Sequence, residues 1–387
     1  MAKDLPPFGT DGMRGSAEAI LGGAEAIGRA GALHFAPEGG TILLASDTRE
    51  SSPEIVNRLA EGLTEAGADV EILGVMPTPA LAYLTRESNA KAGGVTTASH
   101  NPYEDNGVKY FDKNGDKLTD KAQDNFSRLL DGAIPIPSRR RGTQRINPNT
   151  ISQYEDFLVA SAEGVSFDGL RMVIDAANGA ASESAGRVFP RLGADVVMRA
   201  NKPNGRNINE DCGATHTGPL QEAVVSGGYG LGVAFDGDHI IYTLAVASQA
   251  EKDARKRHKG VVVTHMTNLG TENALRAAGI DVVREDVGDR YVLHGLAETG
   301  YKLGGEQSGH IILPELLATG DGMLAAIQTI KAVRASGKSL AEWRDEVRLS
   351  GNVRGKEFPQ PSGVFFASLA QHPPDGFMHQ VVFVTQQ

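Results

Sequence analysis

The sequence predicts an α/β protein composed of three related α/β domains. Three segments carry this prediction, because each has a short apolar strand, a helical pattern and a second apolar strand: residues 41–73, 170–199 and 260–285. Their last residues have nearly the same sequence: "AGADVEI", "LGADVVM" and "AGIDVVR". Repeated strand-helix-strand units with β-branched strands are typical of related α/β domains rather than of one large sheet.

The first of these units shows the plan most clearly. Residues 41–46 predict a strand, a helix begins near Pro53, and residues 69–73 predict a second strand. Proline suits the first turn of a helix, and Gly67 suits the helix exit. Further along the chain, "GGVTTAS" predicts a strand that ends at Ser99, so that its hydroxyl lies where a loop begins.

A segment rich in proline, arginine and polar residues predicts a domain boundary. This segment is "GAIPIPSRRRGTQRINPNT" at residues 132–150. We therefore expect a first domain at 1–137, a linker at 138–149, a second domain at 150–245, a third at 246–345 and an incomplete C-terminal α+β domain at 346–387. The last segment is too short for a robust independent domain.

The composition excludes several classes of function. The 387 residues include 38 Lys and Arg against 48 Asp and Glu, and this net charge of −10 argues against a nucleic-acid-binding surface. No apolar run approaches the roughly 20 residues that span a bilayer, and the N-terminus has no secretory signal. The single cysteine, Cys212, suits a reducing compartment and is expected to be a buried filler. We expect a cytoplasmic protein that binds neither nucleic acid nor membrane.

The densest group of polar residues is "TTASHNPYEDNGVKYF" at residues 96–111. Ser99 and His100 are adjacent, and neighbouring side chains on an extended backbone point to opposite faces, so a Ser-His hydrolase pair is disfavoured. A phosphorylated serine at a strand end is the favoured interpretation. The alternative is an Asn-Pro turn that contains a serine by chance.

Two carboxylates follow another predicted strand. In "GVAFDGDH", residues 232–239, Asp236 and Asp238 stand on either side of a glycine. Paired carboxylates on a tight turn suit a hard divalent cation, Mg²⁺ before Zn²⁺. The alternative is an Asp-Gly turn in which Asp238 caps a helix that follows over residues 239–258.

Two further loops are punctuated by glycine. "GGEQSGH" at residues 304–310, between the predicted strands "YKL" and "IIL", offers hydrogen-bonding side chains for vicinal hydroxyls or an amine. "FGTDGMRG" at residues 8–15 contains Arg14, whose guanidinium suits a phosphate. Each loop alone is also compatible with an ordinary turn.

Together, and in this order along the chain, the four loops resemble those of the α-D-phosphohexomutases. Their amino-acid sequences are most similar to the bacterial phosphoglucosamine mutase branch of that family. The resemblance covers residues 1 to about 345. It implies mixed sheets around a central cleft. It also implies interconversion of glucosamine 6-phosphate and glucosamine 1-phosphate through a phosphoserine and a 1,6-bisphosphate, by a monomer or homodimer.

The resemblance also assigns roles to residues. Ser99 would carry the phosphoryl group and, with Asp236 and Asp238, bind one Mg²⁺. Three residues would lie beside the phosphoserine: Arg14, Lys109 as a candidate for proton transfer, and His100, which would orient the loop. Five would bind the sugar or line the cleft: Glu306, Ser308, His310, Asp289 and Arg290.

The sequence departs from the family at two places. The family's metal loop reads Asp-Gly-Asp-X-Asp-Arg, whereas Asp238 is followed by "HIIY", without the third aspartate or the arginine. The family's C-terminal phosphate loop reads Arg-X-Ser-Gly-Thr-Glu, of which only Ser362 and Gly363 are present. Two alternatives follow from these departures: an active mutase with further residues at these places, or a truncated form with impaired metal and substrate binding. As to substrate, the nearest alternative is a phosphoglucomutase or phosphomannomutase, and the alternative from another class is a sugar-phosphate binding protein without catalysis.

Overall fold

The chain forms three mixed β-sheets within the part that the structure describes. The structure is a computed structural model that describes residues 5–9, 12–131, 140–214, 216–235, 244–248, 258–306, 310–346 and 381–384. The chain divides into two compact units: residues 1–156, 178–184 and 201–210 form the first, and residues 157–177, 185–200 and 211–387 form the second. The predicted α/β class with several mixed sheets is confirmed.

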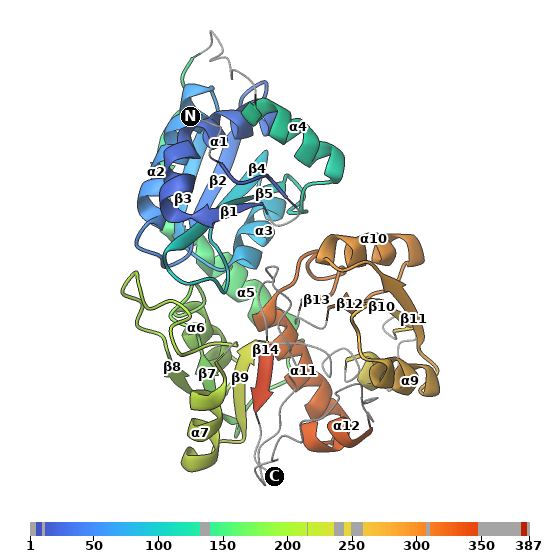
Figure 1. The fold of residues 1–387 in the computed structure, drawn as a ribbon. Coiled ribbons are helices and arrows are strands. Elements are labelled where there is room, and N and C mark those ends of the chain that lie inside the picture. Colours follow the sequence, from blue (N-terminus) through green and yellow to red (C-terminus); the bar gives the residue numbers. More distant parts are fainter. Residues whose placement is uncertain are drawn as a thin grey trace, which may run out of the picture. The chain divides into compact units, whose positions relative to one another are not determined.

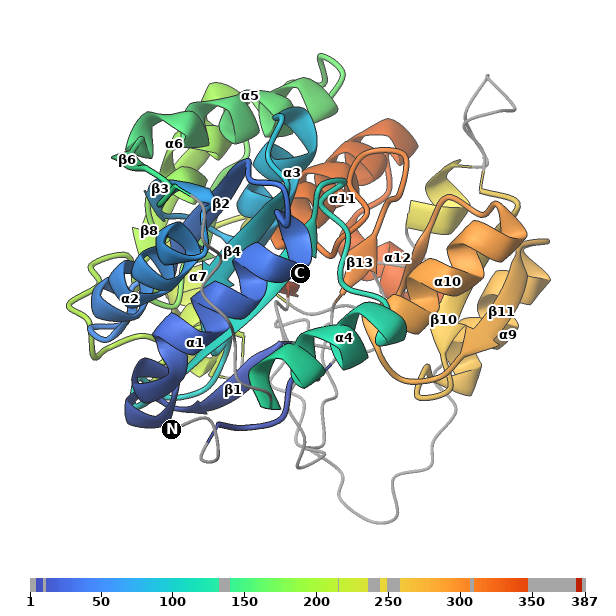
Figure 2. The same ribbon diagram turned by 90° about the horizontal axis from the view of Figure 1, so that it is seen from above.

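The first unit contains a six-stranded sheet in the order β1-β5-β4-β2-β3-β6 (Figures 1 and 2). Strands β2, β3, β4 and β6 run parallel, while β5 is antiparallel to both β4 and β1. Its strands are β1 (Met13–Ser16), β2 (Thr41–Ser46), β3 (Asp69–Val75), β4 (Ala92–Thr96), β5 (Asp105–Asp112) and β6 (Gln144–Ile146). Its helices are α1 (Ala17–Phe35), α2 (Ser52–Glu65), α3 (Thr78–Glu87) and α4 (Asp120–Asp131). A 3₁₀ turn, Pro148–Thr150, leads into α5 (Ile151–Ser161), within which the two units divide.

The second unit contains two four-stranded sheets, ordered β14-β9-β7-β8 and β11-β10-β12-β13. The first of these sheets consists of β7 (Arg171–Asp175), β8 (Asp195–Arg199), β9 (Leu231–Phe235) and β14 (Val381–Val384), with helices α6 (Ser184–Arg191) and α7 (Gly218–Gly227). The other consists of β10 (Gly260–Thr264), β11 (Asp281–Glu285), β12 (Gly304–Gly305) and β13 (Ile311–Ile312), with α9 (Leu269–Ala277), α10 (Asp289–Thr299), α11 (Gly322–Ser336) and α12 (Leu340–Glu346).

All three predicted strand-helix-strand units are present. They are β2-α2-β3, β7-α6-β8 and β10-α9-β11. Pro53 lies in the first turn of α2, and Gly67 follows this helix with a φ of +92°. Cys212 is buried, as expected. None of the described helices is both long and apolar enough to cross a membrane.

Four local predictions differ from the structure. The predicted linker contains strand β6, which pairs in parallel with β3 and so extends the first sheet. The strand predicted at "YKL" instead lies at Gly304–Gly305, where the chain pairs with β10. The strand predicted to end at Ser99 ends at Thr96. The tail strand β14 pairs with β9, within the sheet of β7 and β8. Of the helix predicted over 239–258, most lies outside the described residues.

Helices α1 and α2 lie over one face of the first sheet, and α3 lies over the other (Figures 1 and 2). Adjacent glycines of β4 face opposite sides of the sheet. A Cβ on Gly93 would meet Thr85 of α3 at 2.3 Å, whereas one on Gly94 would meet the ring of Tyr110 at 2.9 Å. That tyrosine in turn lies against Gly31 of α1. Small residues in this strand therefore let layers on both faces approach closely.

Close packing of α1 on α2 depends on glycine. A Cβ on Gly28 would lie 2.3 Å from the carbonyl oxygen of Leu59, and one on Gly62 would lie 2.1 Å from that of Glu25. Contacts this short involve backbone, so the helices would have to separate. By contrast, a Cβ on Gly22, which is exposed in the same helix α1, would meet nothing within 4 Å.

We expect Gly28→Ala to lower the free energy of unfolding by about 2 kcal/mol, because it overpacks the contact between the helices. The matched variant Gly22→Ala should instead raise it by about 0.5–1 kcal/mol, because alanine favours helix and has room there. Urea unfolding of both variants measures the difference. Equal effects of the two substitutions would contradict this account of the α1–α2 contact.

Asp116 lies in the turn after β5, where its carbonyl accepts a hydrogen bond from the backbone N–H of Asp112 at 2.9 Å. Burial raises the pKa of Asp116 to about 6, and the neighbouring carboxylate of Asp112 adds to the rise while Arg86 opposes it. Because the folded pKa lies above the unfolded value, the associated stability is present below about pH 4 and is lost as the pH rises through about 6.

Asp116→Asn should therefore stabilise the protein at pH 8 by about 1 kcal/mol, a figure reduced from the full shift because the side chain is only partly buried. At pH 4 the variant and the wild type should differ little, because the native carboxyl is then protonated. Urea unfolding at the two pH values is the measurement. A gain of the same size at pH 4 and pH 8 would be inconsistent with a raised pKa.

Candidate active site

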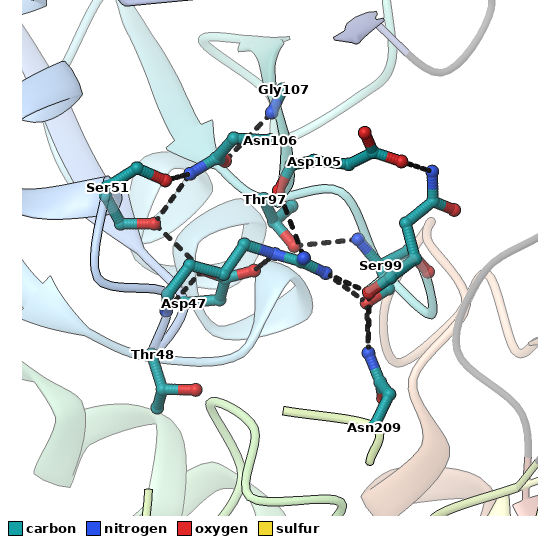
Figure 3. A network of polar contacts seen from close by, with 12 residues as sticks. Asp47, Thr48, Ser51, Thr97, Ser99, Asp105, Asn106, Gly107 and Asn209 are labelled. Carbon is teal, nitrogen blue, oxygen red and sulfur yellow. Dashed lines mark hydrogen bonds and ion pairs between the residues drawn. The ribbon is translucent and has the colours of Figure 1, made fainter. Parts of the chain in front are cut away.

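Ser99 lies in a tight turn just beyond the end of β4. Its backbone has a φ of +56°, in the left-handed region that residues other than glycine rarely adopt. Its N–H donates to Oγ1 of Thr97 at 3.0 Å (Figure 3). The prediction of an extended backbone at Ser99 and His100 is therefore wrong, and so is the geometric reason given against a Ser-His pair. His100 is half-buried in the same turn.

A buried arginine holds this turn in place. Arg49 is 1% exposed, and its Nε donates to Oδ2 of Asp47 at 2.9 Å. Its two terminal nitrogens donate to four carbonyl oxygens of residues 97–105, here called the serine loop: those of Ser99, Asn101, Pro102 and Asp105. All the N–H groups of the Arg49 guanidinium thus donate either to the serine loop or to the carboxylate of Asp47. Arginine suits this position because its planar guanidinium holds five N–H donors in a fixed geometry.

Asp47 connects this arginine to the sheet. It follows β2 directly, and its N–H donates to the carbonyl oxygen of Thr96 at the end of the neighbouring parallel strand β4. Its carboxylate also accepts from the backbone N–H of Arg49 at 3.1 Å and from Oγ of Ser52 at 2.9 Å. The carboxyl ends of β2 and β4 therefore meet, and the serine loop is built upon that junction (Figure 3).

Strands β1 and β5 carry two of the predicted site residues, Arg14 and Lys109, near the carboxyl end of β4. Arg14 of β1 pairs with Gly107 of β5, and the N–H of Thr97 donates to the carbonyl oxygen of Gly107. Lys109, two residues further along β5, is 3% exposed. A Cβ on Gly12, whose φ is +81°, would lie 2.8 Å from Cγ of Lys109, so the glycine in "TDGMRG" gives the lysine its space.

A second cluster lies in the second unit and contains three of the predicted sugar-binding residues. Glu306, His310 and Asp289 are each at most 3% exposed. Nδ1 of His310 lies 3.4 Å from Oε2 of Glu306, and its Nε2 lies 3.9 Å from Oδ2 of Asp289. Oε1 of Glu306 accepts from the N–H of Gly288 at the start of α10. Carboxylates are favoured at a helix N-terminus.

Arg290 adjoins this cluster but turns toward its neighbour. Its guanidinium donates to the hydroxyl of Tyr291 at 2.6 Å and lies 4.6 Å from the centre of that ring. Three predicted residues, Asp236, Asp238 and Ser308, lie outside the described residues. Within the described ranges, no three His, Cys, Asp or Glu side chains are grouped so that they could hold a metal ion.

Sequence reasoning missed Asp47, Arg49 and Asn209, the last of which also contacts the serine loop. A signal for the first two was present, because "SDTR" directly follows a predicted strand and ligand sites gather at such strand ends. For Asn209 there was none, since 110 positions separate it from Ser99.

The fold agrees with a class of α/β enzymes that transfer a phosphoryl group within one substrate, and comparisons with known proteins establish that class. Residues 6–132 match the family model of phosphoglucomutase/phosphomannomutase α/β/α domain I, and residues 236–349 match that of domain III. Phosphoglucosamine mutases of Desulforudis audaxviator and Pelotomaculum thermopropionicum are 42% and 44% identical, each covering 90% of this chain and 84% of its own length. The chain therefore belongs to the phosphohexomutase family.

Solved structures support the same fold. A phosphoglucomutase/phosphomannomutase family protein from Burkholderia thailandensis matches with a TM-score of 0.73 and 22% identity, over 97% of this chain and 92% of that one. An N-acetylphosphoglucosamine mutase from Aspergillus fumigatus, solved with GlcNAc-6P and magnesium, matches with a TM-score of 0.61 and 14% identity, over 98% and 92%. At these identities the likeness concerns the fold alone.

We expect Arg49→Met to lower the free energy of unfolding by about 3–5 kcal/mol, because it leaves the buried carboxylate of Asp47 without its cation. A control is available in the same unit. Arg58 of α2 also forms an ion pair, with Glu25 of α1 at 3.0 Å, but the side chains of both residues are exposed, at 45% and 40%. Arg58→Met should cost less than about 1 kcal/mol. Chemical denaturation compares them, and a loss at Arg49 no larger than at Arg58 would refute the structural role of the buried pair.

Proposed function

We propose that this protein is a phosphoglucosamine mutase that interconverts glucosamine 6-phosphate and glucosamine 1-phosphate. The observation that carries the proposal is Ser99, held by the buried Arg49 in a left-handed turn at the end of β4. The curated relatives named above, which are phosphoglucosamine mutases at 42–44% identity, support the choice of substrate.

In the proposed reaction, phosphorylated Ser99 gives its phosphoryl group to the free hydroxyl of the substrate. The oxygen–phosphorus bond to serine breaks as the bond to the sugar oxygen forms, which yields a 1,6-bisphosphate. The bisphosphate then turns over, and Ser99 accepts the other phosphoryl group. At each transfer the attacking hydroxyl loses a proton and the leaving oxygen gains one. Lys109 is the proposed proton carrier, and Arg14 the proposed stabiliser of phosphoryl charge.

We propose one Mg²⁺ ion held by the phosphate of Ser99, Asp236 and Asp238. The donor set fits this ion, since every ligand atom is a hard oxygen and Asp236 directly follows β9. When bound, the ion would withdraw negative charge from the phosphoryl group during transfer.

The sugar is proposed to bind at the loop from Gly305 to His310. Glu306 and Ser308 are assigned to its hydroxyls, while His310, Asp289 and Arg290 line the site. The buried Glu306–His310–Asp289 cluster supports a rigid base for this loop. We also retain as proposals the domain division predicted from the sequence, the orienting role of His100, a cytoplasmic location, and a monomer or homodimer.

A second candidate is a phosphoglucomutase or phosphomannomutase, because the matching family models carry those names. The measurement that separates the candidates is kcat/KM with glucosamine, glucose and mannose 6-phosphates, each primed with its bisphosphate. The proposed function requires the largest value for the glucosamine compound. No turnover of any of the three would instead favour a form that only binds sugar phosphates.

Ser99→Ala should abolish mutase activity, by roughly 10⁴-fold or more, because the covalent carrier of the phosphoryl group is removed. Intact mass should show about 80 Da of phosphatase-sensitive phosphate on the wild type and none on the variant. Ser226→Ala, at an exposed serine of α7, is the control that should keep both properties. An active Ser99→Ala enzyme would refute the phosphoserine mechanism.

A further inference from the structure

Residues 201–210, here called the asparagine segment, lie against the serine loop although they are about a hundred positions away in sequence. The side-chain Nδ2 of Asn209 donates to the carbonyl oxygen of Ser99 at 2.9 Å and to that of Asn101 at 3.2 Å (Figure 3). The guanidinium of Arg49 donates to the same two oxygens. A carbonyl oxygen has two lone pairs, so both acceptors of the loop are held from two directions.

The backbone of Asn209 is itself built for this contact. Its φ of +61° lies in the left-handed region, where asparagine is several-fold enriched among residues other than glycine. The segment before it is ordered by paired asparagines. Oδ1 of Asn204 accepts from the N–H of Asn207 at 3.0 Å, and Oδ1 of Asn207 accepts from the N–H of Asn204 at 2.9 Å.

Three contacts fasten the asparagine segment and its neighbour Asn178 to the residues that follow β2. The N–H of Glu50 donates to the carbonyl oxygen of Gly205 at 2.9 Å, and Nε of Arg206 donates to the carboxylate of Glu50 at 2.6 Å. Oγ1 of Thr48 donates to the carbonyl oxygen of Asn178, whose own side chain holds the segment through the backbone of residues 202 and 207. The backbone of the asparagine segment is thus held by contacts that are independent of the bonds from Asn209 to the serine loop.

We infer that Asn209 is a positioning residue for the phosphoryl-carrying serine. This inference rests on the proposed function and extends it to a residue outside the predicted site. A left-handed turn at a serine costs on the order of 1–2 kcal/mol, so it persists only where its surroundings fix it. In the proposed reaction the hydroxyl oxygen of this serine must give up and take back a phosphoryl group, and a displacement of about 1 Å can cost about a hundredfold in rate.

The test is Asn209→Gly, which removes the amide and keeps a residue that accepts the positive φ. We expect kcat to fall by about 10–100-fold with KM for glucosamine 6-phosphate within about two-fold, because the loss concerns transfer and not binding. Asn209→Asp, which keeps the shape but has no N–H to donate, should show the same division between kcat and KM. A single-turnover measurement of phosphate loss from Ser99 by intact mass should slow in parallel.

Lys202→Ala is the matched control. Lys202 is exposed in the same segment and takes part in the contacts named above through its backbone N–H, which this substitution keeps, so kcat should stay within about two-fold of wild type. An Asn209→Gly enzyme with wild-type kcat would overturn the inference, as would an equal loss of kcat in Lys202→Ala. A wild type that neither carries phosphate nor turns over would instead refute the proposed function, and the inference with it.

Discussion

The serine loop depends on one buried ion pair. The side chain of Arg49 is fully inaccessible, that of Asp47 is 6% exposed, and between them they join the ends of two parallel strands to four carbonyl groups of one loop. Removing charges from water is costly, and a buried pair repays that cost only when its remaining donors and acceptors are also satisfied. Here every N–H of the guanidinium faces an acceptor, so the pair specifies one conformation of the loop.

The surrounding sheet explains why such a pair is possible. Strands β2 and β4 are parallel neighbours, so their carboxyl ends lie at one edge of the sheet. The antiparallel β5 starts at that edge and contains Gly107 and Lys109. Glycine at 107 has no side chain, and a Cβ there would lie 2.5 Å and 2.7 Å from the carbonyl oxygens of Met13 and Thr97. The close approach of three strands thus places Arg14, the serine turn and Lys109 in one region.

The extent of the successful prediction follows from the range of the interactions involved. Strands β2 and β3 and helix α2 were predictable, because apolar patterns, Pro53 and Gly67 act within a few residues. Ser99 was found through a local motif, but its positive φ was not, since that conformation is imposed by Arg49 from another strand end. Strand β6 lies in a segment whose proline, arginine and polar residues predict a linker, and its three residues are all exposed, so no apolar alternation indicates a strand there.

The contact from Asn209 shows a limit of a different kind. The sequence patterns predict that each candidate site loop belongs to the domain in which its strand lies. In the structure, however, residues 178–184 and 201–210 belong to the first unit, while strands β7 and β8, which precede them, belong to the second. A carbonyl of the serine turn is therefore held by side chains from two separate parts of the chain. The hydroxyl oxygen of Ser99, which in the proposed reaction repeatedly loses and regains a phosphoryl group, needs a fixed position. Support of the Ser99 backbone carbonyl from two directions fixes the residue that carries this hydroxyl, and the second support, from Asn209, is a neutral amide that adds no charge.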